Sequence, residues 1–197
     1  MREGEDEEGY LVALPIVTRR LLLRPAGESE RQAIARLAAN PRVAENLAAS
    51  PGEGAGGTSG SFAVIERESG AVVGGAAFGP VPDRPASAEV AALLGEPYWG
   101  KGYATEAAQA LIDHIFAGTP VMVLWCANRA SNTRARRVIE KCGFQFRGTG
   151  MVRAPGANGA LPVERFILDR RNWESLKAWG AADTKRRPPD APRHTAA

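Results

Sequence analysis

The stretch between residues 87 and 115 constrains the fold most strongly. An apolar run typical of a strand, "SAEVAALLG" (87–95), leads through the turn "EPYWGKG" into a long amphipathic helix. The apolar residues of this helix recur three and four positions apart and form one stripe, made of Ala104, Ala107, Ala108, Leu111, Ile112 and Ile115. The stretch therefore predicts a strand, a glycine-containing turn and a helix that packs on a sheet.

Strands and helices alternate along the rest of the chain. Apolar runs predict further strands at 19–25, 62–68, 71–79, 121–126, 144–150 and 163–169. Apolar residues at helical spacing predict helices at 27–40 and 132–142, a second helical piece is expected at 43–50, and five glycines within residues 50–61 predict a loop. The order of these elements predicts an α/β (α+β) domain with a central mixed sheet and helices on both faces.

Length and composition are those of one globular domain. The chain has 197 residues, 44% of them hydrophobic and 24% charged, and a formal net charge of +3. The acidic start (1–16) and the basic, proline-rich end (179–197) lack apolar periodicity, so we expect disordered tails around a domain at 17–178. No apolar run approaches the roughly 18 residues of a membrane span, and we expect no signal peptide.

The cysteines and histidines argue against a metal protein. Cys126 and Cys142 have no metal-ligand spacing, and the chain has two histidines. We expect no metal, no disulfide framework and a cytoplasmic location. The basic tail is short and has no interleaved aromatic residues, so a nucleic-acid-binding module is the weakest alternative.

The turn after residue 95 resembles a phosphate loop with one position changed. Gly95, Gly100 and Lys101 have the G-x-x-x-x-G-K spacing, but Gly102 offers no hydroxyl for Mg²⁺. The later strand at 121–126 ends without an aspartate, so both metal ligands of a nucleoside-triphosphate site are absent. Glycine N–H groups and the positive end of the following helix can still bind an anion without a metal. The turn therefore predicts a site for a diphosphate.

Four blocks of the sequence carry a family resemblance. They are "TRRLLLRP" (18–25), "AEVAALLGEPYWGKGYATEA" (88–107), "NTRARRVIEKCGF" (132–144) and "VERFILDRRNW" (163–173), which together cover roughly residues 17–174. In these blocks the chain resembles the GNAT superfamily of N-acetyltransferases, and most of all the Rim-type branch that acetylates the N-termini of ribosomal proteins. The resemblance implies a GNAT-like fold whose sheet is mostly antiparallel.

The resemblance also implies acetyl-CoA as co-substrate, with no metal. The pyrophosphate is expected on the N–H groups of Gly100 to Thr105, and the pantetheine arm beside Leu93 to Gly95, where two parallel strands splay apart. The implied cofactor-binding residues are Leu93, Leu94, Gly95, Trp99, Gly100, Lys101, Gly102, Tyr103, Ala104, Thr105 and Asn132.

The catalytic residues implied are Glu89, Asn132 and Glu164. An amine that attacks a thioester must lose a proton, and Glu89 is the first candidate for the base because a carboxylate in an apolar strand is costly unless it faces a cavity or a partner. Glu164 is the second candidate. Asn132 either holds the pantetheine or an ordered water, as in the family, or caps a helix. A backbone N–H near Leu93 or Leu94 is expected to stabilise the oxyanion.

Three positions depart from the family pattern. Trp99 stands where the family usually has glutamine or arginine, so a cation for the phosphates is lost. Ala135 replaces a common serine, and Ile139 replaces the tyrosine that often protonates the leaving thiolate. Water, Tyr103 or Tyr98 is left to supply that proton.

The acceptor remains open between several classes. The leading expectation is a protein N-terminal α-amine, and the alternatives are a small amine (an amino acid, polyamine or antibiotic) or a non-catalytic acyl-CoA sensor. The segment 46–61, which covers the substrate in relatives, is short and rich in glycine here. The protein is expected to be a monomer or a homodimer that binds neither nucleic acid nor membrane.

Overall fold

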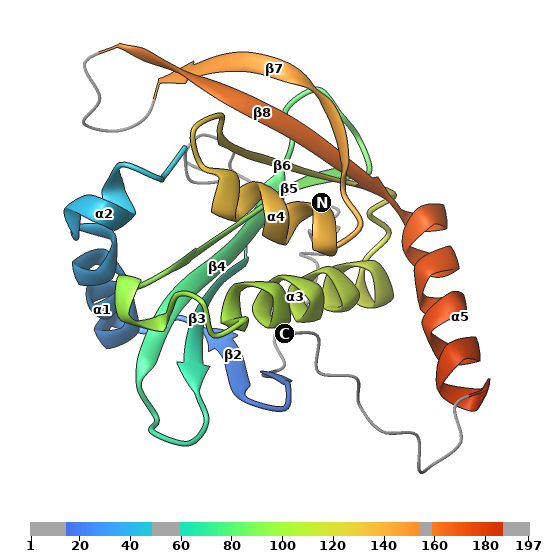
Figure 1. Cartoon of the computed structure of the whole chain (residues 1–197), viewed down its shortest axis with the longest axis horizontal. Helices are drawn as coiled ribbons and strands as arrows, with labels where there is room; N and C mark the ends of the chain where they lie inside the picture. Colours follow the sequence, from blue (N-terminus) through green and yellow to red (C-terminus); the bar gives the residue numbers. More distant parts are fainter. Residues whose placement is uncertain (1–14, 49–59, 154–158, 187–197) are drawn as a thin grey trace, which may run out of the picture.

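The computed structural model describes residues 15–48, 60–153 and 159–186. These residues form an eight-stranded sheet in the order β1-β2-β3-β4-β5-β6-β8-β7 (Figure 1). The strands are β1 (Ile16–Val17), β2 (Leu21–Pro25), β3 (Gly60–Glu66), β4 (Val72–Pro80), β5 (Ser87–Leu94), β6 (Val123–Arg129), β7 (Gln145–Arg153) and β8 (Ala160–Asp169). The expected mixed, mostly antiparallel sheet is confirmed, because β5 and β6 are parallel and the other neighbouring strands are antiparallel.

The parallel pairing of β5 with β6 is short. It comprises three residue pairs, Ser87 with Val123, Ala88 with Leu124, and Glu89 with Trp125. Beyond Glu89 the two strands continue without pairing to each other, β5 to Leu94 and β6 to Arg129. The sheet therefore opens in its middle, at the carboxyl ends of its two parallel strands.

Helices cover both faces of the sheet, as expected. They are α1 (Glu28–Ala38), α2 (Pro41–Ala44), α3 (Tyr103–Gly118), α4 (Thr133–Lys141) and α5 (Arg170–Arg186), with a short 3₁₀ helix at Glu96–Tyr98. A Cβ added at Gly75 of β4 would meet Ile34 of α1 at 3.0 Å, whereas Phe62, whose strand partner is Ala76, packs against His114 of α3. Because successive strand residues point to opposite faces, α1 and α3 lie on opposite sides.

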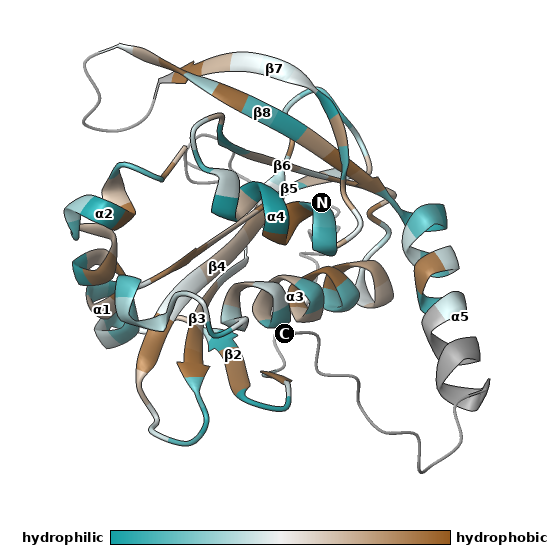
Figure 2. Cartoon of the chain, in the orientation of Figure 1, coloured by the Kyte–Doolittle hydropathy of each residue, from teal (hydrophilic) through white to brown (hydrophobic). Residues whose placement is uncertain are grey.

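The core lies mainly between the sheet and α3. Its largest fully buried side chains include Phe62, Phe116 and Phe166. The predicted stripe of α3 is confirmed, since Ala107, Leu111, Ile112 and Ile115 are buried, and Ala104 and Ala108 pack partly buried against them. Figure 2 shows hydrophobic segments on β3 and β4 and an alternation of hydrophobic and hydrophilic residues along β8.

Both cysteines belong to this core. Cys126 and Cys142 are buried free thiols, and burial raises the pKa of Cys142 to about 12. A thiol held neutral in this way behaves as a small apolar residue, which is the role expected for Cys142 from its place in an apolar stripe.

Some element boundaries differ from those expected. The helical piece predicted at 43–50 is the single turn α2, which Pro41 starts and an Asn40 side chain caps. Strand β3 begins at Gly60, inside the predicted loop, and most of that loop lies outside the described residues. Local patterns do not show where a glycine-rich connection enters a sheet, because the pairing partner of Gly60, Phe78, is distant in sequence.

The predicted tails overlap ordered elements at both ends. Ile16 pairs with Leu23 in β1, a strand of two residues that is too short to show an alternating pattern. Helix α5 continues to Arg186, past the expected boundary at 178. The remaining tail residues, 1–14 and 187–197, lie outside the described residues. None of the helices in the described ranges combines the length and the apolar character needed to cross a membrane.

Candidate active site

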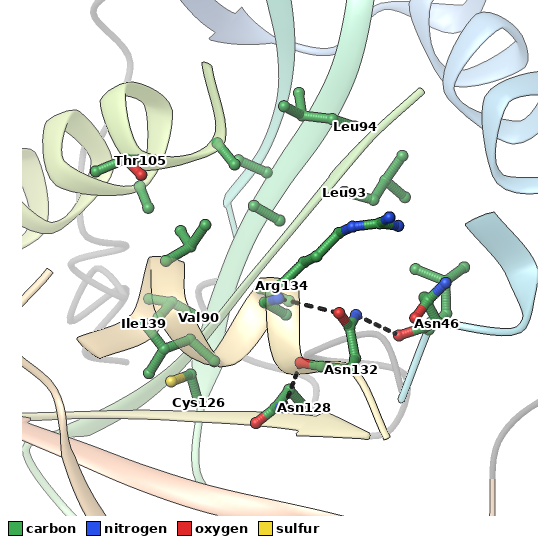
Figure 3. A pocket seen from close by; sticks show the side chains of 18 of the residues that line it. Asn46, Val90, Leu93, Leu94, Thr105, Cys126, Asn128, Asn132, Arg134 and Ile139 are labelled. Carbon is green, nitrogen blue, oxygen red and sulfur yellow. Dashed lines mark hydrogen bonds between the residues drawn. The ribbon is translucent and has the colours of Figure 1, made fainter. Parts of the chain in front are cut away.

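A cavity of about 1080 Å³ opens where β5 and β6 diverge. Its walls come from α1, α2, β4, β5, the glycine turn, α3, β6 and α4 (Figure 3). The structure brings nine of the predicted site residues to this cavity: Leu93, Leu94, Trp99, Gly100, Gly102, Tyr103, Ala104, Thr105 and Asn132. Four others, Gly95, Lys101, Glu89 and Glu164, are not among its lining residues.

The glycine turn at the start of α3 has a backbone that favours glycine. Gly100 and Gly102 have φ values of 76° and 78°, in the left-handed region. Gly102 is the N-cap of α3 and provides no side chain to accept from the first N–H groups of the helix. Those donors and the positive helix end lie on the cavity wall and are suited to binding an anion, which the sequence predicts for this turn.

Arg20, the residue before β2, anchors this turn from outside the cavity. Its Nη1 donates to the carbonyl of Lys101 at 2.8 Å, and its Nε donates to Glu106 of α3 at 2.7 Å. Glu106 also accepts from the Thr18 hydroxyl. Burial disfavours the ionised form of Glu106, but these hydrogen bonds and the Arg20 charge outweigh burial and lower its pKa. The turn and the first turn of α3 are thus fixed to the edge of the sheet.

Trp99 has a structural role at the end of β5. Its indole N–H donates to the carbonyl of Leu94 at 2.9 Å, and the guanidinium of Arg134 lies 5.6 Å from the centre of its ring. The one hydrogen-bond donor of the indole and one face of its ring are therefore occupied within the protein. Arg134, from the first turn of α4, places a cation beside position 99, where the sequence itself has none.

Glu89 occupies the last rung of the parallel pair, beside Trp125. Its antiparallel partner is Gly79, which shares a sheet face with Gly75 and therefore with α1. The side chain is half-buried, and this burial raises the pKa of Glu89 although the charge of Arg165 opposes the shift. A carboxyl group with a raised pKa, next to the point where the strands separate, has the properties of a general base.

Glu164 lies on the opposite face of the sheet. Its register partner on β6 is Asn128, three residues from Trp125, so the two candidate carboxylates point to opposite sides. Glu164 is buried, and its Oε1 accepts from Arg136 of α4 at 2.6 Å. This ion pair attaches α4 to β8, and it places Glu164 away from Glu89.

Asn132 caps α4 and also bridges the cavity. Its Oδ1 accepts from the N–H of Ala135 at 3.0 Å, and its Nδ2 donates to the carbonyl of Asn46 at 3.4 Å (Figure 3). Arg129 makes a parallel contact, with Nε 2.9 Å from the carbonyl of Leu47. The segment after α2 is therefore tied to the start of α4. Sequence reasoning missed Arg129 and Asn46, because their contacts join positions far apart in the chain.

The two tyrosines considered as proton donors differ in their surroundings. The hydroxyl of Tyr103 donates to Glu66 at 2.5 Å, and this hydrogen bond raises the pKa of Tyr103. A phenol held by a carboxylate is a poor proton donor to a thiolate. Tyr98 lines the same cavity, and Lys101 lies over its ring at 5.5 Å.

A comparison with known protein families assigns the elements that build this cavity to one family. A family model described as "Acetyltransferase (GNAT) domain" matches residues 20–145. This range contains β2 to β6, the glycine turn, α3 and α4, so the match covers the elements that build the cavity. The chain belongs to the GNAT acetyltransferase family, and the expectation of an N-acetyltransferase is confirmed at the level of the family.

Known proteins agree with this assignment. An uncharacterized N-acetyltransferase, p20, from Bacillus licheniformis is 27% identical over 117 residues, which is 59% of this chain and 66% of that protein. The GNAT-family acetyltransferase from Bacillus anthracis has the same fold, with a TM-score of 0.67, 22% identity, and coverage of 80% of this chain and 99% of the other.

Two further structures of the same fold are named for different acceptors. A protein from Vibrio cholerae assigned as a ribosomal-protein-serine acetyltransferase has a TM-score of 0.62 and 20% identity, with 79% of this chain and 97% of that chain covered. The spermidine N-acetyltransferase of Vibrio cholerae, solved with CoA and spermine, has a TM-score of 0.67 and 17% identity, with coverage of 80% and 99%. Identities this low show the fold alone.

Proposed function

We propose that this protein transfers an acetyl group from acetyl-CoA to a protein N-terminal α-amine. The observation that carries the proposal is the opening between β5 and β6, which leads to the uncapped start of α3. The opening offers unpaired β-strand edges to an extended arm, and the glycine turn offers N–H donors to a diphosphate. Acetyl-CoA combines these two parts in one molecule.

In the proposed reaction, the amine nitrogen bonds to the acetyl carbon and the carbon–sulfur bond breaks. Glu89 removes a proton from the amine, directly or through water, and a backbone N–H of Leu93 or Leu94 stabilises the oxyanion. The departing thiolate takes its proton from water or from Tyr98, since Tyr103 is held by Glu66. Glu164 and Asn132 are assigned supporting roles, because an ion pair and a helix cap engage their side chains.

Charge on the cavity wall separates the candidate acceptors. The side chains among its described lining residues that are charged at neutral pH are all basic, namely Arg129, Arg134, Arg137 and Lys141. A polyamine carries several positive charges and would be repelled by those cations of the wall that the phosphates of acetyl-CoA do not neutralise. An α-amine with a pKa of about 8 is roughly one-quarter neutral near pH 7.5, whereas only about one in a thousand lysine amines, with a pKa of about 10.4, is neutral there. Both considerations favour the α-amine.

The proposal is tested by supplying acetyl-CoA with two acceptor pools and identifying products by mass spectrometry. One pool contains peptides with free N-termini and methylated lysines, and the other contains spermidine, spermine and free amino acids. We expect acetylated peptide N-termini. Products only in the second pool would reassign the acceptor to a small amine, and binding of acetyl-CoA without any product would indicate an acyl-CoA sensor.

A further inference from the structure

Helix α4 presents three basic side chains to the cavity. Arg134, Arg137 and Lys141 are three and four residues apart, so they share one side of the helix, and all three line the cavity and are exposed. Within the described residues, none of the three has a salt bridge or a side-chain hydrogen bond, in contrast to Arg136, which binds both Glu140 and Glu164. Figure 2 shows much of α4 as hydrophilic.

This face of α4 lies along the same cavity as the glycine turn. The Arg134 guanidinium lies over the ring of Trp99, which immediately precedes Gly100, so the first turn of α4 reaches the proposed diphosphate site. Arg137 and Lys141 follow one and two turns later along the helix. A ligand that leaves the glycine turn along α4 therefore meets these two cations next.

The charges of acetyl-CoA exceed what the glycine turn can neutralise. The molecule carries a diphosphate and, on its ribose, a separate 3′-phosphate monoester with a charge of roughly −1.5 to −2 near neutral pH. The turn contributes one helix end, and its own cation, Lys101, is not among the residues that line the cavity. A second anionic group of this strength requires its own cations, and exposed arginine and lysine are suited to it because a ligand phosphate forms charge-assisted hydrogen bonds with them.

We propose that Arg137 and Lys141, assisted by Arg134, form the subsite for the 3′-phosphate of the CoA moiety. This inference rests on the proposed use of acetyl-CoA and adds a consequence to it. The protein discriminates acetyl-CoA from its dephospho form through α4, by contacts remote from the acetyl group.

The test measures the affinity of the full chain for CoA and for dephospho-CoA by titration calorimetry at low ionic strength. We expect CoA to bind about 10-fold more tightly, since each contact of an exposed cation is weakened by solvent. In Arg137→Gln/Lys141→Gln we expect the ratio of the affinity for CoA to that for dephospho-CoA to fall to about 1, with the affinity for dephospho-CoA unchanged. Added salt should also reduce the preference of the unmodified protein for CoA over dephospho-CoA.

A matched control distinguishes an effect of this subsite from an effect of the net charge of the protein. Arg147→Gln/Arg171→Gln removes the same net charge from exposed positions on β7 and α5 that do not line the cavity, and we expect it to keep the preference. Equal affinity of the unmodified protein for CoA and dephospho-CoA would overturn the proposed subsite. So would a preference for CoA that survives in Arg137→Gln/Lys141→Gln, or one that is lost in Arg147→Gln/Arg171→Gln. Failure of both ligands to bind at millimolar concentration contradicts the proposed function itself. Circular dichroism shows whether each variant is folded.

Discussion

Glu89 is a half-buried carboxyl group in a strand, a position that destabilises its ionised form. Its carboxylate is half-buried, and the burial that raises its pKa makes the ionised form less stable in the folded protein than in the unfolded chain. A carboxyl group with a raised pKa contributes stability below its unfolded pKa and loses that contribution as pH rises through its folded pKa. At neutral pH, Glu89 therefore reduces the stability of the fold, which is expected where a residue serves chemistry.

Glu89→Gln should lower activity and raise stability. We expect kcat to fall by about 10²- to 10⁴-fold near neutral pH, because the base is lost, and the loss to shrink as pH approaches the pKa of the acceptor amine. The same substitution should raise the midpoint of thermal unfolding at neutral pH, with little change in affinity for acetyl-CoA. Kinetic pH profiles and calorimetry measure the two effects.

Glu164→Gln is the matched comparison, because it changes the same group on the opposite face. It weakens the ion pair with Arg136 and should lower stability by about 1–3 kcal/mol while leaving most of kcat. A large loss of kcat in Glu164→Gln, with near-normal kcat in Glu89→Gln, would transfer the role of base to Glu164.

Gly102 has a matched control elsewhere in the chain. Gly102 and Gly70 have φ values of 78° and 72°, and alanine at either costs about 1–2 kcal/mol of backbone strain. Gly70 lies in the turn between β3 and β4, with no atom within 4 Å of an added Cβ. We expect Gly102→Ala to weaken acetyl-CoA binding in addition, and Gly70→Ala to lower stability alone. Equal affinities in the two variants would remove Gly102 from the diphosphate site.

At the scale of elements, Arg20 connects β2 to the loop that should bind the cofactor. Arg20→Gln removes the donors to Lys101 and Glu106, so we expect the KM for acetyl-CoA to rise several-fold with a smaller effect on kcat. Arg67→Gln also removes an arginine that donates to backbone carbonyls, those of Thr18 and Arg19, but not at the glycine turn. It should lower stability without changing KM, as steady-state kinetics and denaturant unfolding can show.

The elements that the sequence predicts best are those with long, regular patterns. Helix α3 and strand β5 each have an apolar pattern strong enough to locate them, and the glycines between them indicate the turn. Strand β1 is too short to have a pattern, and the extent of β3 depends on partners in β4. Tertiary pairing, which a single sequence does not display, decides such boundaries.

The same distinction holds for the candidate site. Residues that act through their backbone, such as Gly100 and Gly102, are visible in a motif. The contact of Asn132 with Asn46, and that of Arg134 with Trp99, joins segments that local spacing cannot relate. Sequence reasoning thus located the glycine turn that lines the cavity, but not the bridge across the cavity or the cation that lies over Trp99.

At the scale of the whole molecule, the cavity wall includes parts of both halves of the sheet, so a ligand that fills it should stabilise the entire fold. Acetyl-CoA at about 100 times its dissociation constant would add about 2.7 kcal/mol to the free energy of unfolding, and raise the unfolding midpoint by several degrees. ATP with Mg²⁺ should have little effect, because Gly102 offers no hydroxyl ligand. Differential scanning fluorimetry compares the two ligands, and stabilisation by ATP alone would support the nucleotide reading of the turn.

The short parallel pairing of β5 with β6 has a consequence for how the chain folds. Strands β3, β4 and β5 pair as successive hairpins, and β7 and β8 form another hairpin, so these parts of the sheet form from contacts close in sequence. Strands β5 and β6 join the two parts of the sheet through three residue pairs. These pairs can form only after the chain between the two strands, which contains α3, has folded back. Contacts of long sequence separation form slowly. In pulse-labelled hydrogen exchange we therefore expect amides that bond between β3 and β4 to gain protection before amides that bond between β5 and β6, so that the opening proposed for the ligand assembles after the hairpins.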